Sequence, residues 1–196
     1  ALAACVAEPV LASLMGGGFL MLRDPRGTTR LLDGFVQTPR RKRPVGETDL
    51  REIVADFGDA TQTFHIGVGS IATPGLGAML AEAHDRAGRI PLRELAAPAC
   101  AAARIGTPIE AFQAKVLGIV CPIYRASPAA RALYLHGEDH APEPGKPIRN
   151  PELSDVIEVF AAEGTPFLME GEPAAALIRL CEEGGHLTRE DLRRYR

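Results

Sequence analysis

Prolines and glycines divide the second part of the chain into a series of helices, and this pattern limits the fold more than any other feature. Residues 74–88 and 91–106 each begin with a proline, which suits the first turn of a helix, and end with a glycine, which suits its close. Strong helix formers fill both interiors. Two further helices are predicted at Ser127-Pro128 and Asn150-Pro151, because each pair offers an N-cap residue followed by a proline at the first helical position.

Apolar spacing and a capping motif extend this prediction to the last residues. Leu153, Val156, Ile157 and Phe160 recur at steps of three and four, so they should form one buried stripe along the helix that starts near Asn150. Residues 188–191 (Thr-Arg-Glu-Asp) resemble a capping box and should begin a last helix. The segment 136–147, which is rich in glycine, proline and charge, predicts a loop.

The front of the chain has a different pattern, that of a β-hairpin. Three glycines at residues 16–18 precede the apolar run 19–22 (Phe-Leu-Met-Leu), and a second short run covers residues 28–32. Residues 24–27 (Asp-Pro-Arg-Gly) form a turn signal between the two runs. The continuous apolarity of the first run predicts a strand that is buried on both faces. The expected fold class is therefore α+β, with a hairpin near the start and a predominantly helical remainder.

Composition permits an enzyme and argues against several other classes. The chain has 196 residues, of which 46% are hydrophobic and 24% charged, so it can bury a real core. A net charge of -3 gives no overall attraction to nucleic acid, and no apolar run approaches the roughly 20 residues of a membrane helix. The four cysteines are scattered without metal-like spacing and are expected to be buried thiols. The compartment stays open between cytoplasm and periplasm.

Three short motifs suggest other chemistries, and each also has a structural explanation. Residues 67–72 (Gly-Val-Gly-Ser-Ile-Ala) fit the glycine pattern of a dinucleotide-binding loop, but Pro74 intrudes and a structural turn is the preferred interpretation. His136 and His140 stand four residues apart, which on a helix would suit a metal, but the surrounding glycine and prolines favour a loop. Ser70 lacks the full frame of a hydrolase nucleophile. We expect no metal and no cofactor.

A family resemblance rests on several motifs in a shared order. Residues 31–39 (Leu-Leu-Asp-Gly-Phe-Val-Gln-Thr-Pro) resemble the Asp-x-Arg-Glu-x-Ala-Pro signature of γ-glutamyltranspeptidases, with Asp33 and Pro39 matching. Phe35 stands where that family has the arginine that holds the substrate α-carboxylate. Further similar segments are Glu8-Pro9, residues 16–19, 70–75, 88–92, 147–164, 184–188 and 191–195. The chain is therefore identified as a member of this family, within the N-terminal-nucleophile hydrolase superfamily.

The resemblance implies a fold, a partner and a mechanism. Residues 1–45 would add strands to the edge of an αββα sandwich core, and residues 46–196 would form the helical region of the large subunit. The catalytic threonine, freed by self-cleavage, would lie in a small subunit or in the remainder of the precursor, so no catalytic residue is expected in this chain. A segment with an unfinished sheet is expected to self-associate when it is alone.

The exchange at Phe35 leaves the substrate open. A guanidinium binds a carboxylate through two charge-assisted hydrogen bonds, whereas a phenyl ring offers an apolar wall. Either Arg40 or Arg41 supplies the missing cation in a γ-glutamyl amidase acting on small molecules such as glutathione, or Phe35 contacts an apolar acyl group in a related acylase. A solvated basic loop over residues 40–43 and a non-catalytic scaffold homologue remain alternatives.

Overall fold

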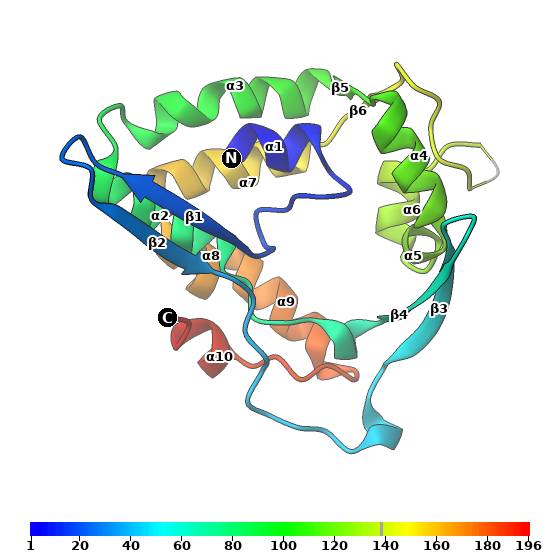
Figure 1. Ribbon diagram of the computed structural model, residues 1–196. Coiled ribbons are helices and arrows are strands. Elements are labelled where there is room, and N and C mark those ends of the chain that lie inside the picture. Colours follow the sequence, from blue (N-terminus) through cyan, green and yellow to red (C-terminus); the bar gives the residue numbers. More distant parts are fainter. Residues whose placement is uncertain (138) are drawn as a thin grey trace.

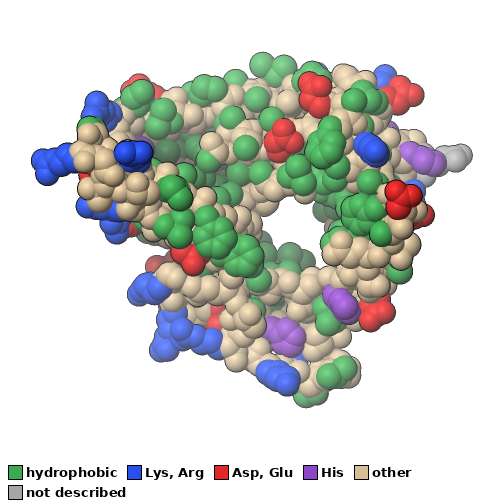
Figure 2. Space-filling view, viewed as in Figure 1, with side chains coloured by type: hydrophobic (Ala, Val, Ile, Leu, Met, Phe, Trp, Pro, Cys, Tyr) green, Lys and Arg blue, Asp and Glu red, His purple; other side chains and the backbone are tan. Residues whose placement is uncertain are grey.

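The computed structural model of the chain describes residues 1–137 and 139–196. Figure 1 shows helices and two long hairpins arranged in a ring, with the two termini on the same side as the first hairpin, and the space-filling view of Figure 2 shows an opening at its centre. The class is α+β, as predicted. The helices are α1 (Leu2–Ala7), α2 (Leu76–Ala87), α3 (Leu92–Ile105), α4 (Ala111–Ile119), α5 (Cys121–Arg125), α6 (Pro128–Tyr134), α7 (Pro151–Glu163), α8 (Thr165–Glu170), α9 (Glu172–Glu182) and α10 (Arg189–Arg193), with short 3-10 turns η1 (Val45–Glu47) and η2 (Val68–Ser70).

The predicted first hairpin is present as β1 (Gly18–Arg23) and β2 (Thr29–Gly34). The strands pair antiparallel from Gly18 opposite Gly34 to Arg23 opposite Thr29. At the turn, Asp24 Oδ1 accepts hydrogen bonds from the backbone N–H groups of Arg26 and Thr28, both at 2.9 Å. This local bonding explains why the Asp-Pro-Arg-Gly segment reverses the chain.

Only one face of this hairpin is covered, so the prediction of burial on both faces of β1 is wrong. Burial alternates along β1, and α2 packs against the face that carries Leu20 and Leu22. Phe19 and Met21 point to the other face and are 59% and 70% exposed. An uninterrupted apolar run is typical of a strand covered on both faces, but among the described residues little packs on the face of Phe19 and Met21.

A second hairpin lies within the segment for which mainly helices were expected. It consists of β3 (Arg51–Asp56) and β4 (Thr61–Ile66), which pair antiparallel with Arg51 opposite Ile66. The turn between them is held by a 2.8 Å hydrogen bond from Gly58 N–H to Asp56 Oδ1. A third, two-residue pair, β5 (Thr107–Pro108) with β6 (Pro147–Ile148), connects the ends of α3 and of the loop before α7.

Two helices form the centre of the largest core. Helices α3 and α7 run along each other, and α1, α2 and α8 pack around them. The predicted stripe of α7 is confirmed, since Ile157 and Phe160 are fully buried and Leu153 and Val156 pack beside them. Smaller cores lie among α8, α9 and α10, and among α4, the Tyr124–Tyr134 pair and the β5–β6 strands.

The predicted caps account for where the helices begin. Ser127 and Asn150 accept hydrogen bonds from the backbone N–H groups of Ala130 and Leu153, and so cap α6 and α7. Thr188 and Asp191 form the reciprocal capping box predicted at α10. The four cysteines are free and buried, as expected. None of the described helices is both long and apolar enough to cross a membrane.

Candidate functional site

The backbone of Phe35 is fixed at the end of β2 by two side chains. Its N–H donates to Asp33 Oδ1 at 2.9 Å, and its carbonyl accepts from the hydroxyl of Tyr195 at 2.7 Å. Burial, followed by the nearby charge of Asp33, raises the pKa of Tyr195, so this hydroxyl keeps its proton and donates. Residues from the two ends of the chain therefore position Phe35 together.

The ring of Phe35 is part of an exposed aromatic pair. It stacks on the ring of Phe19 with centroids 5.4 Å apart and planes 8° from parallel. Phe35 is 53% exposed, and Met21 and Leu31 lie opposite each other on the same face of the hairpin. We call these four side chains the hairpin apolar face. In Figure 2, hydrophobic side chains gather beside the central opening. This surface can contact an apolar group but offers no charge to a carboxylate.

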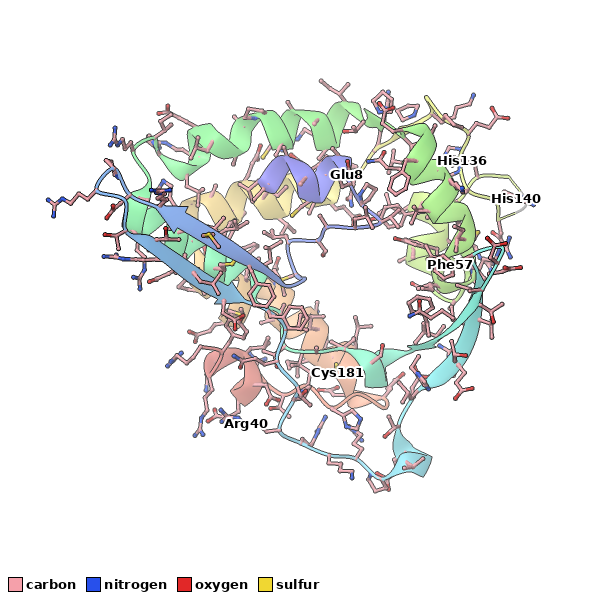
Figure 3. The ribbon with its side chains drawn as sticks, viewed as in Figure 1. Glu8, Arg40, Phe57, His136, His140 and Cys181 are labelled. Carbon is pink, nitrogen blue, oxygen red and sulfur yellow. The ribbon has the colours of Figure 1, made fainter. Side chains whose placement is uncertain are left out.

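Arg40 and Arg41 are held on the α9–α10 side of the structure. The backbone N–H of Arg40 donates to Asp191 Oδ1 at 2.9 Å, and Figure 3 places Arg40 beside α10. Arg41 Nη2 donates to the carbonyl of Gly185 at 2.9 Å. Arg43 donates to the same carbonyl at 2.7 Å and to the carbonyl of Glu182 at 2.9 Å. Arg43 thus bonds carbonyls at the C-terminal end of α9, a favoured place for a cation, and both arginines bond the carbonyl of Gly185, which follows that helix.

Asp191 connects the basic segment to α10. Burial by itself would raise the pKa of its carboxyl, but hydrogen bonds from the Thr188 hydroxyl and from the backbone N–H groups of Arg40 and Thr188 outweigh burial and lower the pKa. Asp191 is 5% exposed and ionised at neutral pH. Its charge therefore stabilises both the start of α10 and the path of the chain after Pro39.

A separate cleft brings Arg41 together with residues from two other segments. It has a volume of about 380 Å³ and is lined by Thr38, Arg41, Lys42, Ser70 and His186, among others. Nδ1 of His186 accepts from the backbone N–H of Arg43 at 3.2 Å. Phe35 does not line this cleft. Of the three residues predicted to bind substrate, the structure therefore groups Arg41 with this cleft and Phe35 with the hairpin apolar face.

The glycine motif at residues 67–72 serves packing. A Cβ at Gly67 or at Gly69 would lie 2.5 or 2.7 Å from the carbonyl oxygen of Asp49, so both positions require glycine. The strand before the motif, β4, pairs antiparallel with β3 instead of belonging to a parallel βαβ unit. The Ser70 hydroxyl donates to the carbonyl of Gly67 at 2.8 Å. These contacts support the structural turn.

The two histidines of the possible metal motif do not share a helix face. His136 and His140 form an antiparallel bridge, with backbone hydrogen bonds of 2.9 and 3.0 Å in both directions. The predicted loop is confirmed there, and Glu138 between them lies outside the described residues. Among the described residues, no group of three or more His, Cys, Asp or Glu side chains could hold a metal ion.

Residues that sequence reasoning did not select complete the surroundings of Phe35. Phe19 supplies the stacking ring, and Tyr195 supplies the hydroxyl that holds the Phe35 carbonyl. The turn at residues 70–75 lies beside them, because a Cβ at Gly75 would fall 1.9 Å from the Tyr195 hydroxyl. The apolar run at residues 19–22 was the available signal for Phe19, although its continuity hid the alternation of burial, whereas Tyr195 gives no local signal.

Comparison with known proteins places this arrangement among its relatives. The chain is 26% identical over 197 residues to the acylase ACY 1 proenzyme of Pseudomonas sp. (strain V22), covering 97% of this chain and 34% of that protein. It is 31% identical over 139 residues to the human glutathione hydrolase 5 proenzyme, covering 68% and 23%. The chain thus spans about a third or less of the length of these curated relatives.

Solved structures share the fold at lower identity. The chain superposes on the γ-glutamyltranspeptidase of Helicobacter pylori with a TM-score of 0.82 at 19% identity, covering all of this chain and 55% of that one. For the cephalosporin acylase of Bacillus halodurans the TM-score is 0.79 at 22% identity, with all of this chain and 36% of that one covered. The family model described as gamma-glutamyltranspeptidase matches residues 1–196, and the chain therefore belongs to the γ-glutamyltranspeptidase family.

Proposed function

We propose that the intact protein is an amidase or acyltransferase of the γ-glutamyltranspeptidase type. The match of the family model to the whole of residues 1–196 carries this proposal. A threonine hydroxyl outside this chain attacks the amide carbonyl, the amine leaves, and water or a second amine then takes the acyl group from the threonyl ester. The residues described here bind the acyl part of the substrate and take no part in bond cleavage.

The partner of this chain is the small subunit or the remainder of its own precursor. The relatives called proenzymes are about three times as long as the matched region, which supports such a partner. The hairpin apolar face is the surface for it, because Phe19, Met21, Leu31 and Phe35 are all more than half exposed. Large apolar side chains gathered on one face of a sheet are typical of a surface that another element covers.

γ-Glutamyl amides such as glutathione are one substrate class, since several relatives are named glutathione hydrolases. For this class Arg40 or Arg41 has to replace the missing arginine at Phe35. Arg41 would first have to exchange its hydrogen bond to the Gly185 carbonyl for the substrate carboxylate. Leaving a buried substrate carboxylate without a cation costs about 3 to 5 kcal/mol, or more than roughly a hundredfold in binding.

A second substrate class, amides of apolar acyl groups, is favoured by one specific observation. Phe35 presents its ring to the open side of the hairpin and stacks it on Phe19. The family resemblance expects a guanidinium at this position, so the aromatic surface supports an apolar acyl group instead. The relatives named acylase ACY 1 and cephalosporin acylase support this second class. Burial against the rings lowers the free energy of an apolar acyl group, whereas burial of a carboxylate there costs free energy.

The two classes are distinguished by comparing the hydrolysis of a γ-glutamyl anilide with that of an uncharged acyl anilide by the intact protein. If Phe35 contacts the acyl group, Phe35→Arg should raise the ratio of γ-glutamyl to uncharged turnover by about tenfold or more, since it restores a charge-assisted bidentate contact. Phe57→Arg is the matched control, because Phe57 is similarly exposed but lies at the β3–β4 turn (Figure 3).

Each outcome has a distinct meaning. A shift in the ratio with Phe35→Arg alone supports the substrate role of Phe35. An unchanged ratio in a folded, active variant removes Phe35 from the substrate site. Failure of the intact protein to cleave itself and to turn over either anilide contradicts the enzymatic proposal and leaves a scaffold homologue.

A further inference from the structure

Besides the basic segment at residues 40–43, positive charge is concentrated at the opposite end of the hairpin from Phe35. The β1–β2 turn and the last turn of α2 form a cleft of about 480 Å³, lined by Arg23, Arg30, Arg86 and Arg89. Figure 2 shows Lys and Arg side chains gathered at this end of the molecule, on the left. Leu22, Pro25 and Ala87 contribute the apolar part of the lining.

Among the described residues, the positive charges of this cleft are only partly balanced by carboxylates. Asp24 is the one carboxylate in the lining, and its Oδ1 already accepts two backbone hydrogen bonds of the turn. Arg86 pairs with Glu82 at 2.5 Å. Within residues 1–137 and 139–196, Arg23, Arg30 and Arg89 form no ion pair.

Several guanidinium groups that share one cleft repel one another, and an anion bound between them removes that cost. The planar fork of arginine matches the oxygens of phosphate, to which it can donate two parallel hydrogen bonds. The lining contains no aromatic ring, so it offers no platform on which a nucleobase could stack. These features together select a small molecule that carries one or more phosphate groups.

We propose that the cleft between the β1–β2 turn and the end of α2 is a binding site for a small phosphate-bearing molecule. Arg30 and Arg89 contact the phosphate from the hairpin and from the α2–α3 connection, and Arg23 and Arg86 close the two sides. The site is separate from Phe35, because the strands run five residue steps from the Gly18–Gly34 pair to the Arg23–Thr29 pair, which is about 17 Å.

The test is calorimetric titration of the intact protein at low salt with inorganic pyrophosphate and, in a second arm, with glucose 6-phosphate. We expect saturable binding of at least one of them at one site per chain. Arg30→Gln and Arg89→Gln should each weaken it about tenfold or more, because each loses a charge-assisted contact. Arg26→Gln is the matched control, since Arg26 is on the same turn and removes the same charge but does not line the cleft. Its effect should stay below about twofold.

The two titrations distinguish an inorganic phosphate from a phosphate ester. Saturable binding of either probe supports the proposal, and the probe that binds more tightly identifies the preferred class. Three results would overturn the proposal: no saturable binding of either probe, equal weakening by Arg26→Gln and Arg89→Gln, or equally tight binding of citrate. All variants should retain the wild-type circular dichroism spectrum, since the three side chains are exposed. Anilide hydrolysis is measured separately, so failure here leaves the proposed amidase function untouched.

Discussion

At the scale of single residues, Asp191 shows how one charge can order two segments. It accepts hydrogen bonds from Thr188 at the start of α10 and from the backbone of Arg40, far away in sequence. The capping box could be read from the Thr-Arg-Glu-Asp spacing, because it is local. The bond to Arg40 could not, because no spacing rule links positions 151 residues apart.

A pH-dependent contribution to stability follows from Asp191. Its pKa is lowered in the folded state, so its stabilisation is fully present above the unfolded value near 3.8 and is lost as pH falls below that value. Asp191→Asn should therefore lower the free energy of unfolding by about 1 to 2 kcal/mol at pH 7, with the difference from wild type shrinking below about pH 4. Urea unfolding across this pH range measures it. Asp59→Asn, in the exposed β3–β4 turn, should show no such pattern.

At the scale of elements, the structure follows the sequence where local rules apply. Proline and glycine positions predicted α2 and α3 to within two residues, and the first hairpin formed around its Asp-Pro-Arg-Gly turn. The β3–β4 hairpin was missed, although Gly58, with Asp56 and Asp59 on either side, was a usable turn signal. The prediction that both faces of β1 are buried was wrong, because a sequence pattern does not say which element would cover the second face. The hydrogen bonds of Arg41 and Arg43 to the segment 181–185 are tertiary contacts and had no local signal.

The turn at Gly75 is expected to be intolerant of any side chain. A Cβ there would lie 1.9 Å from the Tyr195 hydroxyl and 2.4 Å from the carbonyl oxygen of Gly34, so α2, β2 and the last residues would have to separate. Gly75→Ala should lower the free energy of unfolding of the intact protein by about 2 kcal/mol or more.

Gly118→Ala in α4 is the control for Gly75→Ala, because nothing lies within 4 Å of its Cβ. It should raise stability by about 0.4 to 1 kcal/mol. Equal effects of the two in thermal unfolding would contradict this account.

At the scale of the whole molecule, the chain places its two distinctive surfaces at opposite ends of one hairpin. The exposed rings of Phe19 and Phe35 lie at one end and the arginine cleft at the other. Within the first surface only Phe35 was singled out from the sequence, because its exchange interrupts a known signature, and its exposed contact with Phe19 was not expected. The second joins the β1–β2 turn to the end of α2, and therefore becomes visible only once the chain is folded.

The exposed face should also govern how residues 1–196 behave when expressed alone. Phe19, Met21, Leu31 and Phe35 are each more than half exposed on a two-stranded sheet, and a face of this kind drives association because its burial removes apolar area from water. We expect oligomers at high concentration by light scattering. The double change Phe19→Ser and Phe35→Ser should shift them toward monomer. Phe112→Ser should not, although Phe112 is 67% exposed, because it lies on α4 away from the hairpin. A clean monomer of the unaltered chain would show that an apolar face of this size is tolerated in water, and would remove the argument that it is reserved for the rest of the precursor.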